Sequence, residues 1–251
     1  MTDGYRVGQT RQTVIGLALA SAIVGAWAAV HVYAVFFLRL SGAGAWAAAP
    51  LALLETWLGA GVFIVAHDAM HGSLSPRLPV LNLWVGRVSL GLYAFFPYDA
   101  VARKHHAHHR HAGGEGDPDF HPDRPRAFWP WYARFFRAYF GWGQLGGIFA
   151  VVLLYSLALH ASILNILLFW ALPAIGSSLQ LFTFGTWLPH RHTDQAFCDR
   201  HNARSLEYGW LGSLAACFHF GYHVEHHRAP QAPWWALPAV RAARRADEAA
   251  A

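Results

Sequence analysis

Histidine is the residue type in this sequence whose spacing could support chemistry, because most of its 17 copies stand in a few tight clusters. The first cluster holds His67 and His71, four residues apart. That spacing puts two side chains on one face of a helix, about 5–6 Å apart, where they could share a metal ion. Alone, such a pair is more often a pair of hydrogen-bonded helix histidines.

A second cluster, residues 103–111, has five imidazoles within seven residues, and a third follows at residues 222–227. The pattern HxxHH occurs once in each, at His105, His108, His109, His223, His226 and His227. A solvated basic surface is the alternative for the second cluster, and His106 and His111 also allow other registers, so that His106 competes with His105. The three clusters together indicate a metal site.

The ligand types and the absence of known metal motifs limit which metals such a site could hold. Structural zinc takes four ligands and usually thiolates. The HExxH motif of zinc proteases and the Glu-x-x-His motif of soluble di-iron bundles do not occur in the sequence. Two metal ions that share many neutral nitrogens fit better, and imidazole suits iron. Asp117 and Glu225 are candidates for orienting the imidazoles, or for capping helices.

The elements that carry these clusters are predicted to be membrane helices. Of the 251 residues, 55% are hydrophobic and 13% are charged, against about 25% charged in average soluble domains. The apolar residues form four runs, arranged as two hairpins. Each run is long enough, or nearly long enough, to span a membrane. We expect one all-α integral membrane domain over residues 1–251, with spans at about 14–38, 45–66, 144–159 and 161–188. A cleaved signal peptide is disfavoured, because the first run stays apolar to its end.

Three other segments complete the expected domain. Residues 78–98 are apolar but interrupted by Asn82 and Arg87, and a fifth span there would separate the histidines across the membrane. We therefore expect a re-entrant or interfacial helical segment. The aromatic residues 128–142 predict a helix in the headgroup region. The alanine-rich, charged tail, residues 239–251, is expected to fray.

The distribution of positive charge predicts the orientation. With both hairpins entering from one side, the far-side loops are residues 41–44 and the turn near His160, and neither contains Lys or Arg. Of the 19 basic residues, only Arg39 lies close to that side. By the positive-inside rule the histidines form a cytoplasmic cap. The net charge of +5 does not point to nucleic acid, because the basic residues flank apolar spans.

His190, at the cytoplasmic end of the last expected span, should emerge beside His71 and is therefore a candidate ninth ligand. A redox metal at the membrane face, under apolar spans, suits a long lipid-soluble substrate. Composition does not distinguish a carotenoid from an acyl chain or an alkane. A membrane metal transporter or metal-binding protein is the non-enzyme alternative. Transport needs polar ligands near the midplane, where the spans hold only scattered candidates.

The three histidine clusters resemble those of the membrane fatty-acid desaturase and hydroxylase superfamily. Residues 67–72, 184–191 and 222–230, followed by 233–235, resemble bacterial β-carotene ketolases, and the resemblance extends from about Glu55 to Pro238. It implies nine catalytic metal ligands, with His190 as the extra ligand before the third cluster: His67, His71, His105, His108, His109, His190, His223, His226 and His227.

The same resemblance implies an O₂-dependent oxygenase with two iron ions (Fe²⁺) in the bacterial inner membrane. Its substrate would be a lipid-soluble carotenoid, and its electron donor a ferredoxin-type protein. The implied reaction oxidises the C4 methylene of a β-ionone ring to a ketone, from β-carotene to echinenone and then canthaxanthin. A fatty-acyl desaturase or hydroxylase, or an alkane monooxygenase, of the same superfamily is the alternative enzyme.

Overall fold

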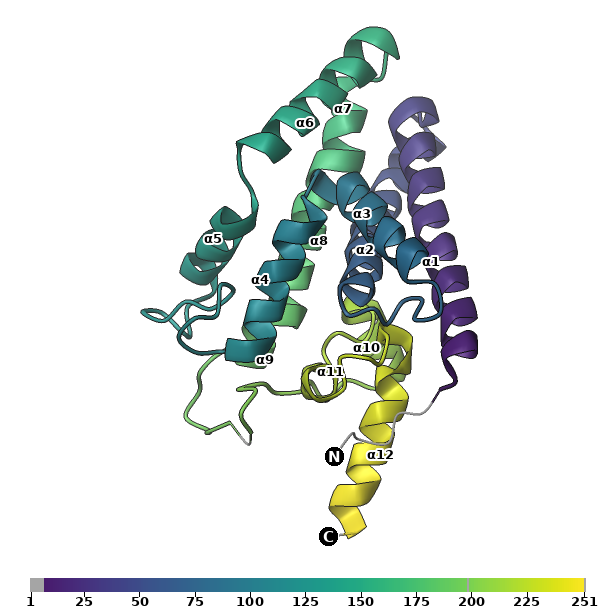
Figure 1. Ribbon diagram of the computed structural model, residues 1–251. Helices are drawn as coiled ribbons and strands as arrows, with labels where there is room; N and C mark the ends of the chain where they lie inside the picture. The colour runs from purple at the N-terminus through teal and green to yellow at the C-terminus, as the bar shows by residue number, and fades with distance from the viewer. Residues whose placement is uncertain (1–6, 198, 251) are drawn as a thin grey trace.

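The computed structural model describes residues 7–197 and 199–250, and over these residues the chain is helical, without a β-strand. The expected all-α class is therefore confirmed. Long helices run side by side between two ends of the molecule, and shorter helices gather at one of these ends (Figure 1). In chain order the main helices are α1 (Gln9–Val32), α2 (Ala43–Met70), α3 (Pro79–Ala94), α4 (Tyr98–His111), α5 (Phe128–Tyr139), α6 (Trp142–Leu153), α7 (Ile163–Ile166), α8 (Leu172–Phe182), α9 (Leu188–His190), α10 (Trp210–Cys217), α11 (His223–Arg228) and α12 (Leu237–Ala250).

Three continuous helices are long and apolar enough to cross a membrane: Gln9–Phe37, Ala43–Met70 and Ile163–His190. They match three of the four expected spans. The remaining one, at residues 144–159, lies in the helix Trp142–Ala158, which passes the same test only together with α5. The structure thus has three candidate spans, or up to five if each bent helix pair is one span. The expected number of four is not confirmed.

Two sharp bends separate the bent pairs. Between α3 and α4 the chain turns by 99°. Phe95 ends α3 with a left-handed backbone (φ 59°), and Pro97 disfavours helical backbone at the residue before it. Between α5 and α6 the turn is 80°, made by extended backbone at Phe140 and Gly141. The segment expected to be re-entrant or interfacial is therefore a helix, α3, which is joined to α4 by this bend.

α2 lies at the centre of the packing and contacts α1, α3 and α8. The contact with α3 is close because Gly86 has no side chain. A Cβ atom there would lie 2.8 Å from the Ala69 side chain and 2.4 Å from the Tyr98 ring. Small residues allow membrane helices to approach in this way. The approach holds the end of α2 beside the start of α4.

The surface of the long helices is apolar. Trp46, Leu53 and Leu157 are 86%, 71% and 71% exposed, whereas the polar residues Glu55 and Asn165 are buried. Large contiguous apolar surfaces are rare on soluble monomers. This inverted pattern is that of a protein whose long helices face lipid.

The C-terminal residues form a docked helix. Residues 239–250 lie in α12, and Leu237, Val240 and Arg241 are buried. The expectation that this tail frays is wrong for the first turns of α12, where Arg241 and Arg244 pair with the buried Glu225, whereas residues 245–250 are helical but exposed. Ala251 lies outside the described residues.

Candidate metal centre

Four elements bring the nine expected ligands to one end of the molecule. These elements are the end of α2, the second half of α4, α9 and α11. Figure 1 shows α9 and α11 at the same end of the molecule as α12. The histidines fall into two groups, and within each group the ligand nitrogens lie within 4.8 Å of one another. The five-histidine group is His67, His71, His105, His109 and His226, and the four-histidine group is His108, His190, His223 and His227.

The end of α2 is closed so that His71 is its last side chain. Gly72 has a left-handed backbone (φ 67°), and the N–H groups of Ser73 and Leu74 donate to the carbonyl of Asp68. These bonds satisfy a free carbonyl at the helix end. His67 and His71 therefore project from the final turn, where α4 packs against it.

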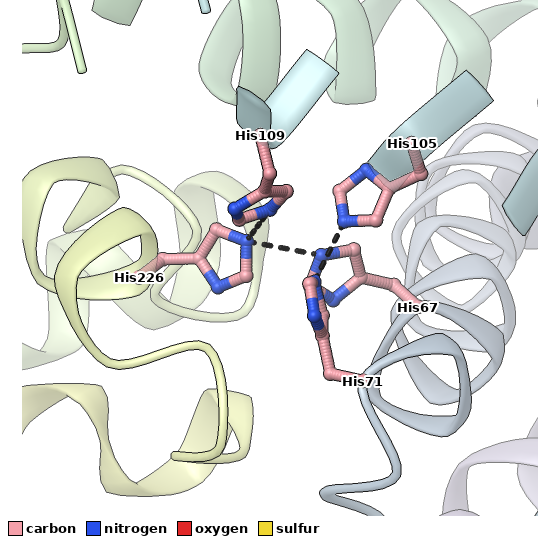
Figure 2. Close-up of side chains that lie close together, drawn as sticks. All are labelled: His67, His71, His105, His109 and His226. Carbon is pink, nitrogen blue, oxygen red and sulfur yellow. Dashed lines mark hydrogen bonds between the residues drawn. The ribbon is translucent and has the colours of Figure 1, made fainter. Parts of the chain in front are cut away.

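In the five-histidine group the rings turn their Nε2 atoms inward (Figure 2). Nε2 of His226 lies 3.2 Å from Nε2 of His67 and 2.9 Å from Nε2 of His109. Nε2 of His71 lies 2.7 Å from Nε2 of His105. A neutral imidazole offers one donor and one acceptor nitrogen. Nitrogens that converge in this way are better placed to bind a common cation than to hydrogen-bond to one another.

The four-histidine group is completely buried. Nε2 of His227 lies 3.0 Å from Nε2 of His223. Nε2 of His190 is buried and has no hydrogen bond to any described residue. A buried polar atom without a partner is unfavourable, and coordination to a metal would remove that penalty.

Two histidines of the four-histidine group are oriented by acceptors at their outer nitrogen. Nδ1 of His108 donates to the Asp117 carboxylate at 3.0 Å. Nδ1 of His190 donates to the carbonyl of Asn202 at 2.8 Å. A proton on Nδ1 leaves Nε2 as the unprotonated nitrogen that faces the group.

His190 follows a π-helical turn at Thr183–Trp187. Single π-helical turns inside α-helices are frequent at functional sites. A Cβ atom on Gly185, within this turn, would lie 2.8 Å from the Phe220 ring, so glycine permits the close contact there. Arg191 then leaves the helix with extended backbone (ψ 133°). The turn determines which way the His190 ring points.

His105 and His106, the two alternatives in the second cluster, have different surroundings. His105 belongs to the five-histidine group. Nε2 of His106 instead donates to the carbonyl of Met70 at 3.1 Å. That carbonyl lies in the last turn of α2, so His106 attaches α4 to α2 from outside the two groups.

Glu225 is fully buried between histidines of the third cluster, but its hydrogen bonds run to other residues. Oε1 accepts from Arg241 at 3.2 Å and from Arg244 at 3.0 Å, and Ser205 donates to Oε2. The Arg241 guanidinium also lies over the Tyr222 ring, 4.6 Å from its centroid. Glu225 thus connects α11 to α12.

Asp117 and Asp119 form a buried pair beside His108. The N–H of Asp119 donates to Asp117 at 2.8 Å, and so does the N–H of Gly113. Burial raises the pKa of Asp119 above its usual range. Burial also acts to raise the pKa of Asp117, but the contacts with His108 and the hydrogen bonds from the N–H groups of Asp119 and Gly113 together outweigh it, and the pKa is lowered. Asp117 is therefore the carboxylate that stays ionised.

The histidines of α11 are held neutral. Burial, together with the neighbouring imidazoles, lowers the pKa of His223, His226 and His227 well below the usual value. Neutral imidazole is the form that binds a metal. An all-nitrogen, thiolate-free set of this size fits two divalent transition-metal ions.

A cavity of about 400 Å³ begins at the histidines. Four of them line one end: His67, His105, His108 and His223. Most of the other lining residues are apolar, and they continue along the last long helix from Thr186 to Ile163. At about 1.5 Å per residue that stretch of helix is about 35 Å long. The cavity therefore suits a long, narrow, apolar molecule.

Some residues of the site carried no signal in the sequence. Tyr139 lines the cavity beside Asp119, yet it is one of many aromatic residues in its segment. Asn202 contributes only its backbone carbonyl to His190, which no side-chain motif could reveal.

The sequence matches the model of the family described as fatty acid desaturase, over residues 43–151 and 144–251. A β-carotene ketolase of Paracoccus sp. (strain N81106 / MBIC 01143) is 47% identical over 230 residues, which cover 91% of this chain and 93% of that protein. The β-carotene ketolase of Paracoccus sp. (strain PC1) is 44% identical over 240 residues, covering 95% and 97%. A zeaxanthin 4-ketolase of Chlamydomonas reinhardtii is 37% identical over 244 residues, covering 92% of this chain and 54% of that protein.

Proposed function

The chain belongs to the fatty acid desaturase family, and within it we propose that the protein is a β-carotene ketolase. It converts the C4 methylene of a carotenoid β-ionone ring to a ketone, in two successive oxidations with O₂. The observation that carries this proposal is the apolar cavity that starts at four of the nine grouped histidines and follows a membrane helix. The ketolase relatives, similar over nearly the whole chain, supply the chemistry.

The two histidine groups would each hold one iron ion. Bound iron would supply the activation of O₂ and the one-electron chemistry that removes hydrogen from a C–H bond. Asp117 and the Asn202 carbonyl keep Nε2 of His108 and His190 free for the metal. The buried position of the four-histidine group excludes water from that side of the site.

The reaction at carbon balances as two hydroxylations and a dehydration. The allylic C–H bond at C4 is the weakest in the ring, and its oxidation gives the C4 alcohol. A second hydroxylation at the same carbon gives a geminal diol, which loses water to form the ketone. Each hydroxylation uses one O₂, two electrons and two protons and releases one water. A ferredoxin-type protein is the proposed electron donor.

The protein itself positions the substrate. The apolar lining holds the polyene along the last long helix, so that one ring reaches the histidines while the other lies towards Ile163. One ring is oxidised at a time, which predicts a monoketone before the diketone. Holding a reacting carbon in place is a large part of any such catalysis.

The membrane orientation is also part of the proposal. The histidine end carries nearly all the Lys and Arg residues, whereas the loops at the other end contain Arg39 alone. By the positive-inside rule the histidines face the cytoplasm in a bacterial inner membrane. That side is where a soluble electron donor is available.

Expression in a bacterium that makes β-carotene tests the function. We expect echinenone and then canthaxanthin, with a trace of the C4 alcohol, and ¹⁸O from ¹⁸O₂ in that alcohol. His226→Ala should abolish ketone formation, whereas His111→Ala, at an exposed position, should not. Hydroxylation at C3, new double bonds in fatty acids, or unchanged carotenoids with iron and reductant present would contradict the ketolase proposal.

A further inference from the structure

Asp119 and Tyr139 are two polar side chains at the histidine end of an otherwise mostly apolar cavity. Asp119 lies in the loop after α4, and Tyr139 is the last residue of α5. The Tyr139 hydroxyl donates to Oδ1 of Asp119. The proposed metal ligand His108 lines the same end of the cavity.

Surrounding contacts hold this pair in place. The buried indole of Trp131 donates to the Asp119 carbonyl at 2.6 Å. The Lys104 ammonium lies over the Tyr139 ring, 4.8 Å from its centroid, and donates to the carbonyl of Ala138. The two side chains are therefore fixed before a substrate arrives.

The pair, which lines the cavity, keeps unused hydrogen-bonding capacity. Oδ2 of Asp119 receives no hydrogen bond from a described residue, and its distance to Nδ1 of His108, 3.9 Å, is too long for one. By contrast, Tyr93 and Ser178, two polar lining residues further along the cavity, already have partners. Tyr93 bonds to Ser177 at 3.1 Å, and Ser178 accepts from Tyr132 at 3.2 Å.

A ring that carries a hydroxyl needs such an acceptor when it is buried, because a buried hydroxyl without a partner is unfavourable. We propose that Asp119 and Tyr139 form a hydroxyl-binding subsite for an alcohol on the β-ionone ring. The alcohol has two possible sources: the C4 alcohol formed halfway through the reaction, or a hydroxyl that the ring already carries at C3. The two carbons are adjacent, so one subsite can serve both. This inference rests on the proposed ketolase function.

The test compares Tyr139→Phe and Asp119→Asn with the unsubstituted protein, each supplied separately with β-carotene and with zeaxanthin, which carries a C3 hydroxyl on each ring. Tyr132→Phe is the matched control, since it removes the same hydroxyl from the same helix, at a bond away from the histidines. Products are quantified by chromatography. Binding of both pigments to the iron-loaded proteins without reductant provides a readout that does not depend on turnover.

If the subsite holds the C4 alcohol, Tyr139→Phe and Asp119→Asn should release about tenfold more of that alcohol from β-carotene. If it holds a C3 hydroxyl, the preference for zeaxanthin over β-carotene, in ketone formation and in binding, should fall about tenfold. Unchanged alcohol release and unchanged preference in both variants would overturn the subsite. Absence of ketone from the unsubstituted protein would instead refute the ketolase function, and the binding preference would still decide on the subsite.

Discussion

His109 and His227 stack across the boundary between the two histidine groups, with ring centroids 4.3 Å apart and ring planes at 29°. His109 projects from α4 and belongs to the five-histidine group, whereas His227 projects from α11 and belongs to the four-histidine group. The two proposed metal positions are thus separated by a pair of packed rings. A displacement of α11 therefore disturbs both groups at once.

Glu225 and the arginines of α12 should control the position of α11. Glu225→Gln removes the buried ionic partner of Arg241, which is 6% exposed and keeps only the exposed Glu207. We expect the free energy of unfolding to fall by about 3 kcal/mol, and the iron content per protein to fall with it. Glu248→Gln, which removes an exposed partner of Arg244, is the control and should change stability by less than about 0.5 kcal/mol. Equal melting temperatures for the two variants would contradict this role.

His105 and His106 can be distinguished by metal analysis. His105→Ala should lower the iron bound per protein and abolish ketone formation, because His105 belongs to the five-histidine group. His106→Ala removes one hydrogen bond to Met70 and should lower stability by about 1 kcal/mol while iron content is retained. The opposite result would place His106 in the site.

Removal of the metal should make stability depend on pH. The pKa values of His223, His226 and His227 are lowered in the folded chain, first of all by burial, whereas the unfolded chain binds protons near its ordinary value of about 6.5. The stabilising contribution is therefore present above pH 6.5 and is lost as the pH falls below it. Melting temperatures of chelator-treated protein between pH 8 and pH 5 should show this fall, and a flat profile would argue against neutral histidines.

His31 belongs to a buried polar contact between three membrane segments. Its Nδ1 lies 3.2 Å from Glu55, and its Nε2 lies 3.3 Å from the Tyr155 hydroxyl. His31→Ala should lower the free energy of unfolding by about 1–3 kcal/mol, because it leaves Glu55 buried without that partner. The double variant His31→Leu with Glu55→Leu should recover most of the loss. Iron content should remain unchanged in both, since these residues lie outside the histidine groups.

The orientation can be tested with reporter fusions. Fusions at Gly44 and His160 should report the periplasm, and a fusion at Gly114 should report the cytoplasm, because Lys and Arg are absent from the first two regions. A periplasmic signal at Gly114 would reverse the orientation.

The sequence predicted the helical class and the nine histidines that the structure brings together, because histidine spacing on a helix is a local property. The predicted number of four spans is not confirmed. The bends at Phe95 and at Gly141 depend on packing between helices as well as on local residues. Glu225 was a candidate for orienting the imidazoles or for capping a helix, and its contact with Arg241 and Arg244 could not be predicted, because the docking of α12 depends on tertiary contacts. Tyr139 was missed because its contact with Asp119 is also a tertiary contact.

The π-helical turn at Thr183–Trp187 has a consequence for the length of the last long helix. Deleting one residue from the regular helix before this turn would rotate everything after it by about 100°. His190 would then point away from the other histidines, although the helix would still be long enough to span a bilayer. The direction of the His190 ring thus fixes the number of residues between the lipid-facing part of the helix and His190. An insertion or deletion that would still leave the helix long enough to span the bilayer would misplace this ring.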